Sequence, residues 1–67
     1  MRRIDGWSVF GVFGFFNEIT MEPDQGCDPM VFCMTEADAK KALAEYNANP
    51  SDRYDYYFVE GDSQLDP

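Results

Sequence analysis

The acidic side chains are the residues of this chain that could do the most chemistry. Thirteen Asp and Glu residues stand against five Lys and Arg, there is no His, and the formal net charge is −8. Without His, the usual general base near neutral pH is missing. Glu18 with Glu22, or Asp24 with Asp28, could form a carboxylate pair, but such pairs arise by chance in so acidic a chain. We therefore predict that the protein is not an enzyme and has no catalytic residue.

Metal binding and thiol chemistry are also poorly supported. Cys27 or Cys33 as a nucleophile would lack a base partner, and two thiols cannot complete a tetrahedral zinc site. The acids between residues 22 and 28 depart from the calcium-loop template, which needs alternating ligands before a Gly and a late Glu. If residues 30–34 are extended, the two sulfurs lie up to roughly 20 Å apart, too far for a disulfide. We predict two free and mostly buried thiols, no metal and no cofactor.

Binding is the chemistry that the acids support. Between Ile4 and Ala39 the chain has seven acids and no base. Such a surface repels duplex DNA and anionic membranes and attracts a basic partner. Acids at 18, 22 and 24 have the same parity, so in an extended chain they project from one side, with neighbouring same-side positions about 6.6 Å apart. This spacing is comparable with that of successive phosphates along a DNA strand. We predict a partner-binding acidic row: Glu18, Glu22, Asp24, Asp28, Glu36 and Asp38.

The stretch GWSVFGVFGFF, residues 6–16, is the most apolar part of the chain. It follows Arg2 and Arg3 in the manner of a signal peptide, but Asp5 interrupts the basic start and no small-residue cleavage site follows Phe16. A bilayer helix needs about 20 apolar residues, twice this length. Glycines among β-branched and aromatic residues favour a strand. We predict a core strand in a cytoplasmic protein that makes no membrane contact.

The remaining segments predict further strands and one helix. Residues 18–22 alternate polar and apolar side chains as a second strand does, 23–26 have turn chemistry, and 30–34 form a short third strand. Thr35 with Asp38 is close to a capping box and opens a helix that runs to about Asn47. Four apolar residues recur at helical spacing and give that helix one apolar face: Ala39, Ala42, Leu43 and Tyr46. Residues 53–60 predict a fourth strand.

These elements predict an α+β fold. We expect one domain over residues 1–61, with an antiparallel sheet of three to four strands, one helix packed on one face and the order β-β-β-α-β. A flexible acidic tail is expected over residues 62–67.

The first strand has two apolar faces, and a single helix cannot cover both. One face carries Trp7, Val9, Gly11, Phe13 and Phe15. The other side carries a second apolar set: Phe10, Val12, Phe16 and Tyr57. Either some of these residues lie at the surface and form an interface patch, or the twisted sheet and residues 17–29 fold over them. Both alternatives stay open from the sequence.

A small acidic domain with this base-free row resembles the phage-encoded inhibitors that imitate DNA, anti-CRISPR and anti-restriction proteins among them. The resemblance covers size, charge and a β-rich single-domain layout, and it includes no motif, so it assigns no residue. It implies an inhibitor that blocks a basic nucleic-acid-binding surface of a host defence complex in the host cytoplasm, without touching nucleic acid itself. The alternative is a structural or regulatory protein that forms a homodimer through its aromatic sheet face. Salt should weaken the first kind of association and preserve or tighten the second.

Overall fold

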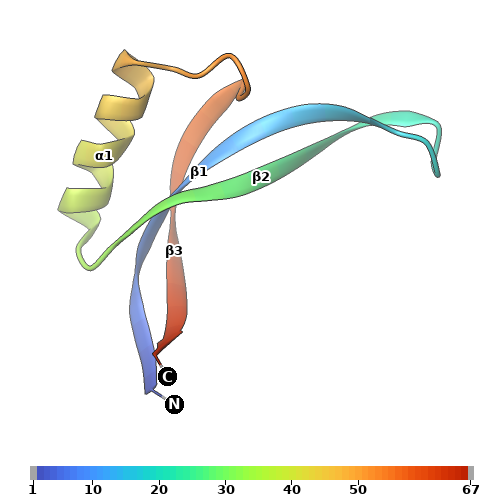
Figure 1. Cartoon of the computed structure of the whole chain (residues 1–67). Coiled ribbons are helices and arrows are strands. Elements are labelled where there is room, and N and C mark those ends of the chain that lie inside the picture. The colour runs from blue at the N-terminus through green and yellow to red at the C-terminus, as the bar shows by residue number, and fades with distance from the viewer. Residues whose placement is uncertain (1, 67) are drawn as a thin grey trace.

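The computed structural model describes residues 2–66 as one sheet and one helix (Figure 1). The elements are β1 (Arg2–Asn17), β2 (Glu22–Cys33), α1 (Glu36–Ala48) and β3 (Tyr56–Asp66). β1 lies in the centre of a sheet of order β2-β1-β3, and both of its neighbours run antiparallel to it. The α+β class, the antiparallel sheet and the single helix are confirmed for the described residues. The sheet has three strands, so the element order is β-β-α-β.

The predicted second strand at residues 18–22 is wrong. Residues 18–21 form the turn that joins β1 to β2, where Met21 has φ 59° and its N–H donates to the Asn17 carbonyl at 2.8 Å. The Asn17 side chain also accepts the Ile19 N–H at 3.0 Å, a local bond by which Asn stabilises turns. The alternation at 18–22 therefore marks no sheet face.

The predicted turn at 23–26 and residues 30–33 of the predicted third strand belong to one long strand, β2, and Met34 lies just beyond its end. Proline is tolerated in β2 because this strand forms one edge of the sheet, where the missing N–H would face solvent. The register shifts between Val9, which faces Val31, and Phe10, which faces Pro29, leaving Met30 as a bulge. The bulge changes the local twist without ending the strand.

The chain end is also more ordered than expected. β3 continues to Asp66 and pairs with the start of β1, from Gly6 opposite Asp62 to Arg2 opposite Asp66. The Ser8 hydroxyl donates to the Asp62 carboxylate at 2.8 Å. Residues 62–66 therefore form a strand and not a flexible tail, because β1 supplies a backbone partner that their own composition does not reveal. Residue 1 of the predicted domain and residue 67 of the predicted tail lie outside the described residues.

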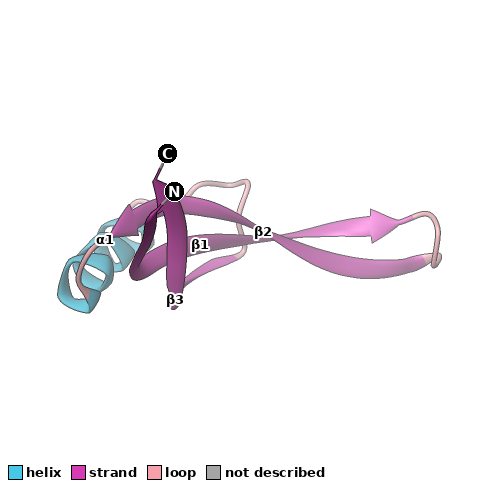
Figure 2. Ribbon diagram, turned by 90° about the horizontal axis from the view of Figure 1, so that it is seen from below, coloured by secondary structure: helices cyan, strands magenta, loops and turns pink. Residues whose placement is uncertain are grey.

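The sheet divides into two arms. β1 pairs with β3 over residues 2–12 and with β2 over residues 7–17, so three strands lie side by side only around residues 7–12. Beyond this centre, residues 13–26 form a two-stranded hairpin arm, and residues 2–6 with 62–66 form a terminal arm. Figures 1 and 2 show the two arms leaving the centre in different directions. The chain measures 40 × 32 × 15 Å and is thus extended and thin.

A small core lies where α1 packs on the centre of the sheet. Val9 and Ala39 are fully buried, and the Tyr46 ring stacks on the buried Tyr57 ring with centroids 5.3 Å apart. Val12 is buried on the opposite face of the sheet, beside Tyr56 and Phe58. The predicted apolar face of the helix is confirmed: its members are buried or half-buried, while Ala37 and Ala44 are exposed.

The core is shorter along β1 than the sequence indicated. Trp7 and Phe13 are half-buried, but Phe15 is 44% exposed, because α1 covers the centre of the sheet and not the hairpin arm. Of the four residues on which the sequence left two alternatives, Val12 is buried, Phe10 is half-buried and Phe16 is 57% exposed. The placement of Tyr57 with them is wrong, because Tyr57 pairs with Gly11 and is buried against Tyr46 on the α1 face. The exposed aromatic side chains of β1 therefore lie on the hairpin arm.

Thr35 should stabilise the start of α1. Its hydroxyl accepts the Asp38 N–H at 3.2 Å, which confirms the predicted N-cap. We expect Thr35→Ala to lower the free energy of unfolding by about 1 kcal/mol, because an N–H of the first turn then loses its acceptor. Urea denaturation followed by circular dichroism measures this, with Thr35→Ser as the control that retains the hydroxyl. Equal stability of the Ala and Ser variants would contradict the role of the cap.

Candidate protein-binding site

The end of the hairpin arm gathers the first part of the predicted acidic row. Glu18 lies in the exposed turn, while Glu22 and Asp24 lie two residues apart on β2 and so project from the same face. Across the strand pair they face Asn17 and Phe15. The only short contacts of the Asp24 carboxylate among the described residues are local ones, with the Gln25 N–H at 2.8 Å and the Asn17 amide at 3.4 Å. These three acids are therefore free to meet a partner.

Asp28 has a different role. It is half-buried and accepts the Tyr54 hydroxyl at 2.8 Å, and the Arg53 guanidinium lies 3.5 Å away and 5.7 Å from the Tyr54 ring centroid. The hydrogen bond to Asp28 raises the pKa of the Tyr54 hydroxyl above its ordinary value. Asp28 thus attaches the segment before β3 to β2, and its carboxylate already has internal partners.

The last two acids of the row lie far from the hairpin end. Glu36 and Asp38 begin α1, and β2 separates them from Glu22 by about 36 Å if the strand is straight. Figure 1 shows α1 and the hairpin turn at opposite sides of the molecule. Glu36 also forms an ion pair with Lys40 at 2.9 Å. The structure therefore brings Glu18, Glu22 and Asp24 together and places the remainder of the row elsewhere.

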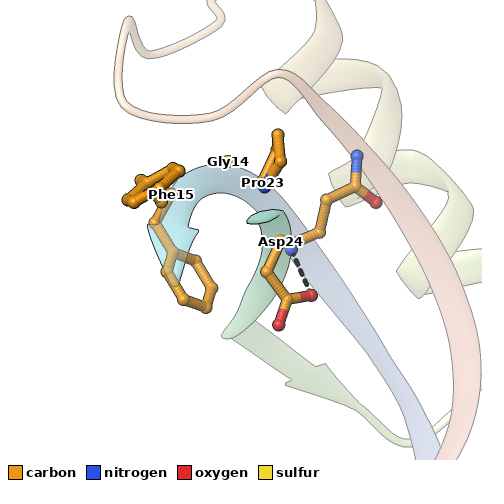
Figure 3. Close-up of a pocket in the computed structure, with 6 residues that line it drawn as sticks. Gly14, Phe15, Pro23 and Asp24 are labelled. Carbon is orange, nitrogen blue, oxygen red and sulfur yellow. Dashed lines mark hydrogen bonds between the residues drawn. The ribbon is translucent and has the colours of Figure 1, made fainter. Parts of the chain in front are cut away.

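Of the apolar side chains that accompany these acids, sequence reasoning left Phe16 open as a possible surface residue and missed the others. Ile19 is 93% exposed at the turn, with Met21 beside it, and the exposed Phe15 and Phe16 follow along the arm. A shallow groove spans the two paired strands of the arm, lined by Gly14, Phe15, Phe16, Pro23, Asp24 and Gln25 (Figure 3). Asn17 before a short polar segment was the local signal for a turn, and it would have exposed Ile19 and Met21.

The two cysteines are free, as predicted. Cys33 is half-buried, so the expectation of a mostly buried thiol holds for it only in part. Cys27 is exposed on β2, so the expectation is wrong for Cys27. Cys27 lies opposite Val12 on β2, at the edge of the three-stranded centre that adjoins the hairpin arm.

No known protein family, curated protein or solved structure matches the chain. Within residues 2–66, no helix is long and apolar enough to cross a membrane. Function is therefore inferred from the geometry and the charge of the hairpin arm.

Proposed function

We propose that this chain is a non-catalytic protein-binding module whose working element is the hairpin arm. The observation that supports this most directly is the projection of residues 13–26 beyond the core, with acids and exposed apolar side chains on the same ribbon. A two-stranded hairpin on its own is marginally stable in water. An arm of this kind gains order when a partner covers it.

Charge and apolar surface contribute to binding in different ways. Glu18, Glu22 and Asp24 raise the rate of encounter with a basic surface and select against acidic partners, and salt screens both effects. Ile19 and Met21, exposed at the turn, supply apolar area that a partner can bury. The fitting partner is therefore a protein with a groove lined by Lys and Arg and an apolar floor.

A groove that binds nucleic acid has this chemistry. Glu22 and Asp24 lie about 6.6 Å apart along an extended strand, close to the spacing of backbone phosphates. We infer that the module inhibits its partner by occupying such a groove in a host defence complex, in the manner of anti-CRISPR or anti-restriction inhibitors. The protein itself, with its net charge of −8, does not bind nucleic acid.

The test compares two variants that change the charge equally. The arm variant carries Glu18→Gln, Glu22→Gln and Asp24→Asn, and Asp28 is left intact because it accepts the Tyr54 hydroxyl. The control carries Glu45→Gln, Asp52→Asn and Glu60→Gln, all exposed and away from the arm. We expect the arm variant to associate about 10-fold more slowly than the control at low salt, because electrostatic steering is lost.

The partner for this measurement is captured from a bacterial lysate at low salt, identified and purified. It should be a nucleic-acid-binding protein that duplex DNA displaces from the immobilised module. Surface plasmon resonance at low and high salt then gives the association rates. If the arm variant associates as fast as the control, or if duplex DNA does not compete, the proposed function is wrong.

A further inference from the structure

We propose that two copies of this chain pair through the free edge of β1 in the hairpin arm, residues 13–17, around a two-fold axis at Phe15. This dimer goes beyond the proposed function, which concerns a basic partner. In it, two β1 strands lie antiparallel, and the two hairpin arms become one four-stranded sheet.

The edge at residues 13–17 differs from every other free edge that residues 2–66 present. The outer edge of β2 carries Pro23, Pro29 and a bulge, and the outer edge of β3 carries Glu60, Asp62 and Asp66. The free edge of the terminal arm, at the start of β1, carries Arg2, Arg3 and Asp5. Prolines, bulges and charges are the features by which proteins keep sheet edges from pairing. The sequence Phe-Gly-Phe-Phe-Asn at 13–17 has none of them.

Backbone groups along this edge point outward. The Val12 carbonyl accepts the Asp55 N–H at 2.6 Å, so it faces the side on which β3 lies. Alternate residues of an antiparallel strand direct their N–H and C=O groups to the same side. Gly14 and Phe16 therefore present theirs to the same edge, where β3 does not reach because its pairing with β1 stops at Val12. A symmetric partner can satisfy all of these groups, with Gly14 of each copy opposite Phe16 of the other.

The side chains fit the same register. Phe15 would face Phe15 of the second copy, where directly opposed aromatic residues stabilise a sheet. It would extend an existing aromatic row, in which the ring centroids of Tyr54 and Phe13 are 6.4 Å apart and those of Phe13 and Phe15 are 6.0 Å apart. The exposed Phe16 would lie beside Gly14 of the partner, which has no side chain of its own but has the Asp55 carboxylate next to it.

The chain is more extended than a compact monomer and leaves surface on which a second copy can pack. The chain exposes 5066 Å², whereas a folded monomer of its mass exposes about 4,300 Å². Its radius of gyration is 14.0 Å, against about 11 Å for a compact chain of this length. The chain thus exposes about 700 Å² more than a compact monomer of its mass, and the hairpin arm that contains the pairing edge is one of the two arms that make it extended.

Charge gives the dimer a salt dependence of its own. Two copies with a net charge of −8 repel each other, but the pairing segment is uncharged, so salt should tighten the association. The Asp55 carboxylate lies beside Gly14, 3.6 Å from the position of a Cβ, and puts one negative charge of each copy near the seam. Binding to a basic partner weakens with salt, so failure of the dimer and failure of the proposed function are distinguishable.

Sedimentation equilibrium of the full chain at low and high salt tests the proposal. We expect a dimer whose dissociation constant falls as salt rises. Phe15→Glu, which places like charges opposite each other, should raise that constant at least 10-fold, and Met34→Glu, the same change at another exposed position, should leave it near the parent value. Asp55→Asn should tighten the dimer at low salt.

Three results would overturn the dimer: a parent chain that remains monomeric at all salt concentrations, a Phe15→Glu variant that dimerises like Met34→Glu, or an Asp55→Asn variant that dimerises no better than the parent. Circular dichroism establishes whether Phe15→Glu is folded. If it is not, the Asp55→Asn measurement decides, because that exposed side chain has no hydrogen bond within the described residues.

Discussion

Gly6→Ala should strongly destabilise the protein, while Gly61→Ala should leave its stability unchanged or slightly raised. A Cβ on Gly6 would lie 2.5 Å from the Cys33 carbonyl oxygen and 2.6 Å from the Phe32 ring. The ring can rotate away, but the carbonyl belongs to the last residue of β2, so the strand end must move. Gly61 faces Trp7 on the neighbouring strand, and a Cβ there meets nothing within 4 Å.

The two substitutions should therefore change the free energy of unfolding in opposite directions. We expect Gly6→Ala to lower the free energy of unfolding by about 3 kcal/mol, at the upper end of overpacking effects. Gly61→Ala should raise it by about 0.5 kcal/mol, because the unfolded chain loses freedom and the fold gains no clash. A domain of this length has a total stability of about 3 to 10 kcal/mol, so the first change is a large fraction of it. Chemical denaturation measures both variants, and equal midpoints would show that the close approach at Gly6 is easily relieved.

The helix could be predicted from the sequence because its signals are local. The Thr35 cap, the acid three residues later and the apolar spacing from Ala39 to Tyr46 all lie within α1 or next to it. The structure places the end of the helix at Ala48, one residue beyond the expected Asn47. Local hydrogen bonds and one contact face determine these features, so no knowledge of the remaining chain was needed.

The sheet was harder to predict because its pairing is non-local. Pro23 and Gly26 have turn chemistry, yet they lie within β2, an edge strand that tolerates both. Residues 62–66 have a tail-like composition, yet they pair with residues 2–6 at the opposite end of the chain. In both cases the backbone partner supplied by β1 decides the structure, and the side chains of the segment itself do not.

The acidic row shows the same limit. Spacing along the sequence correctly grouped Glu22 with Asp24, which share one face of β2. It could not show that Asp28 accepts a hydroxyl from Tyr54, 26 residues away, or that β2 is long enough to separate Glu22 from Glu36. Charges are readable from a sequence, whereas their neighbours depend on the fold.

Ala39→Leu should have the second large effect, because Ala39 determines how closely α1 approaches the sheet. Ala39 is fully buried in the contact between α1 and the sheet, whose centre is the fully buried Val9. Three additional carbon atoms would push the helix outward and disturb the stacking of Tyr46 on Tyr57. We expect the free energy of unfolding to fall by about 2 to 3 kcal/mol.

Ala44→Leu is the matched control, since Ala44 is exposed on the same helix. Leu and Ala have similar helix propensities, so the control removes the intrinsic contribution and isolates packing. Near-ultraviolet circular dichroism should show a loss of the tyrosine signal in Ala39→Leu and none in Ala44→Leu, with denaturation giving the energies. If Ala39→Leu were as stable as Ala44→Leu, the helix would have room to move. The thin core would then owe its stability to the strands and to the Tyr54 ring, which packs on the centre of the sheet at Gly11.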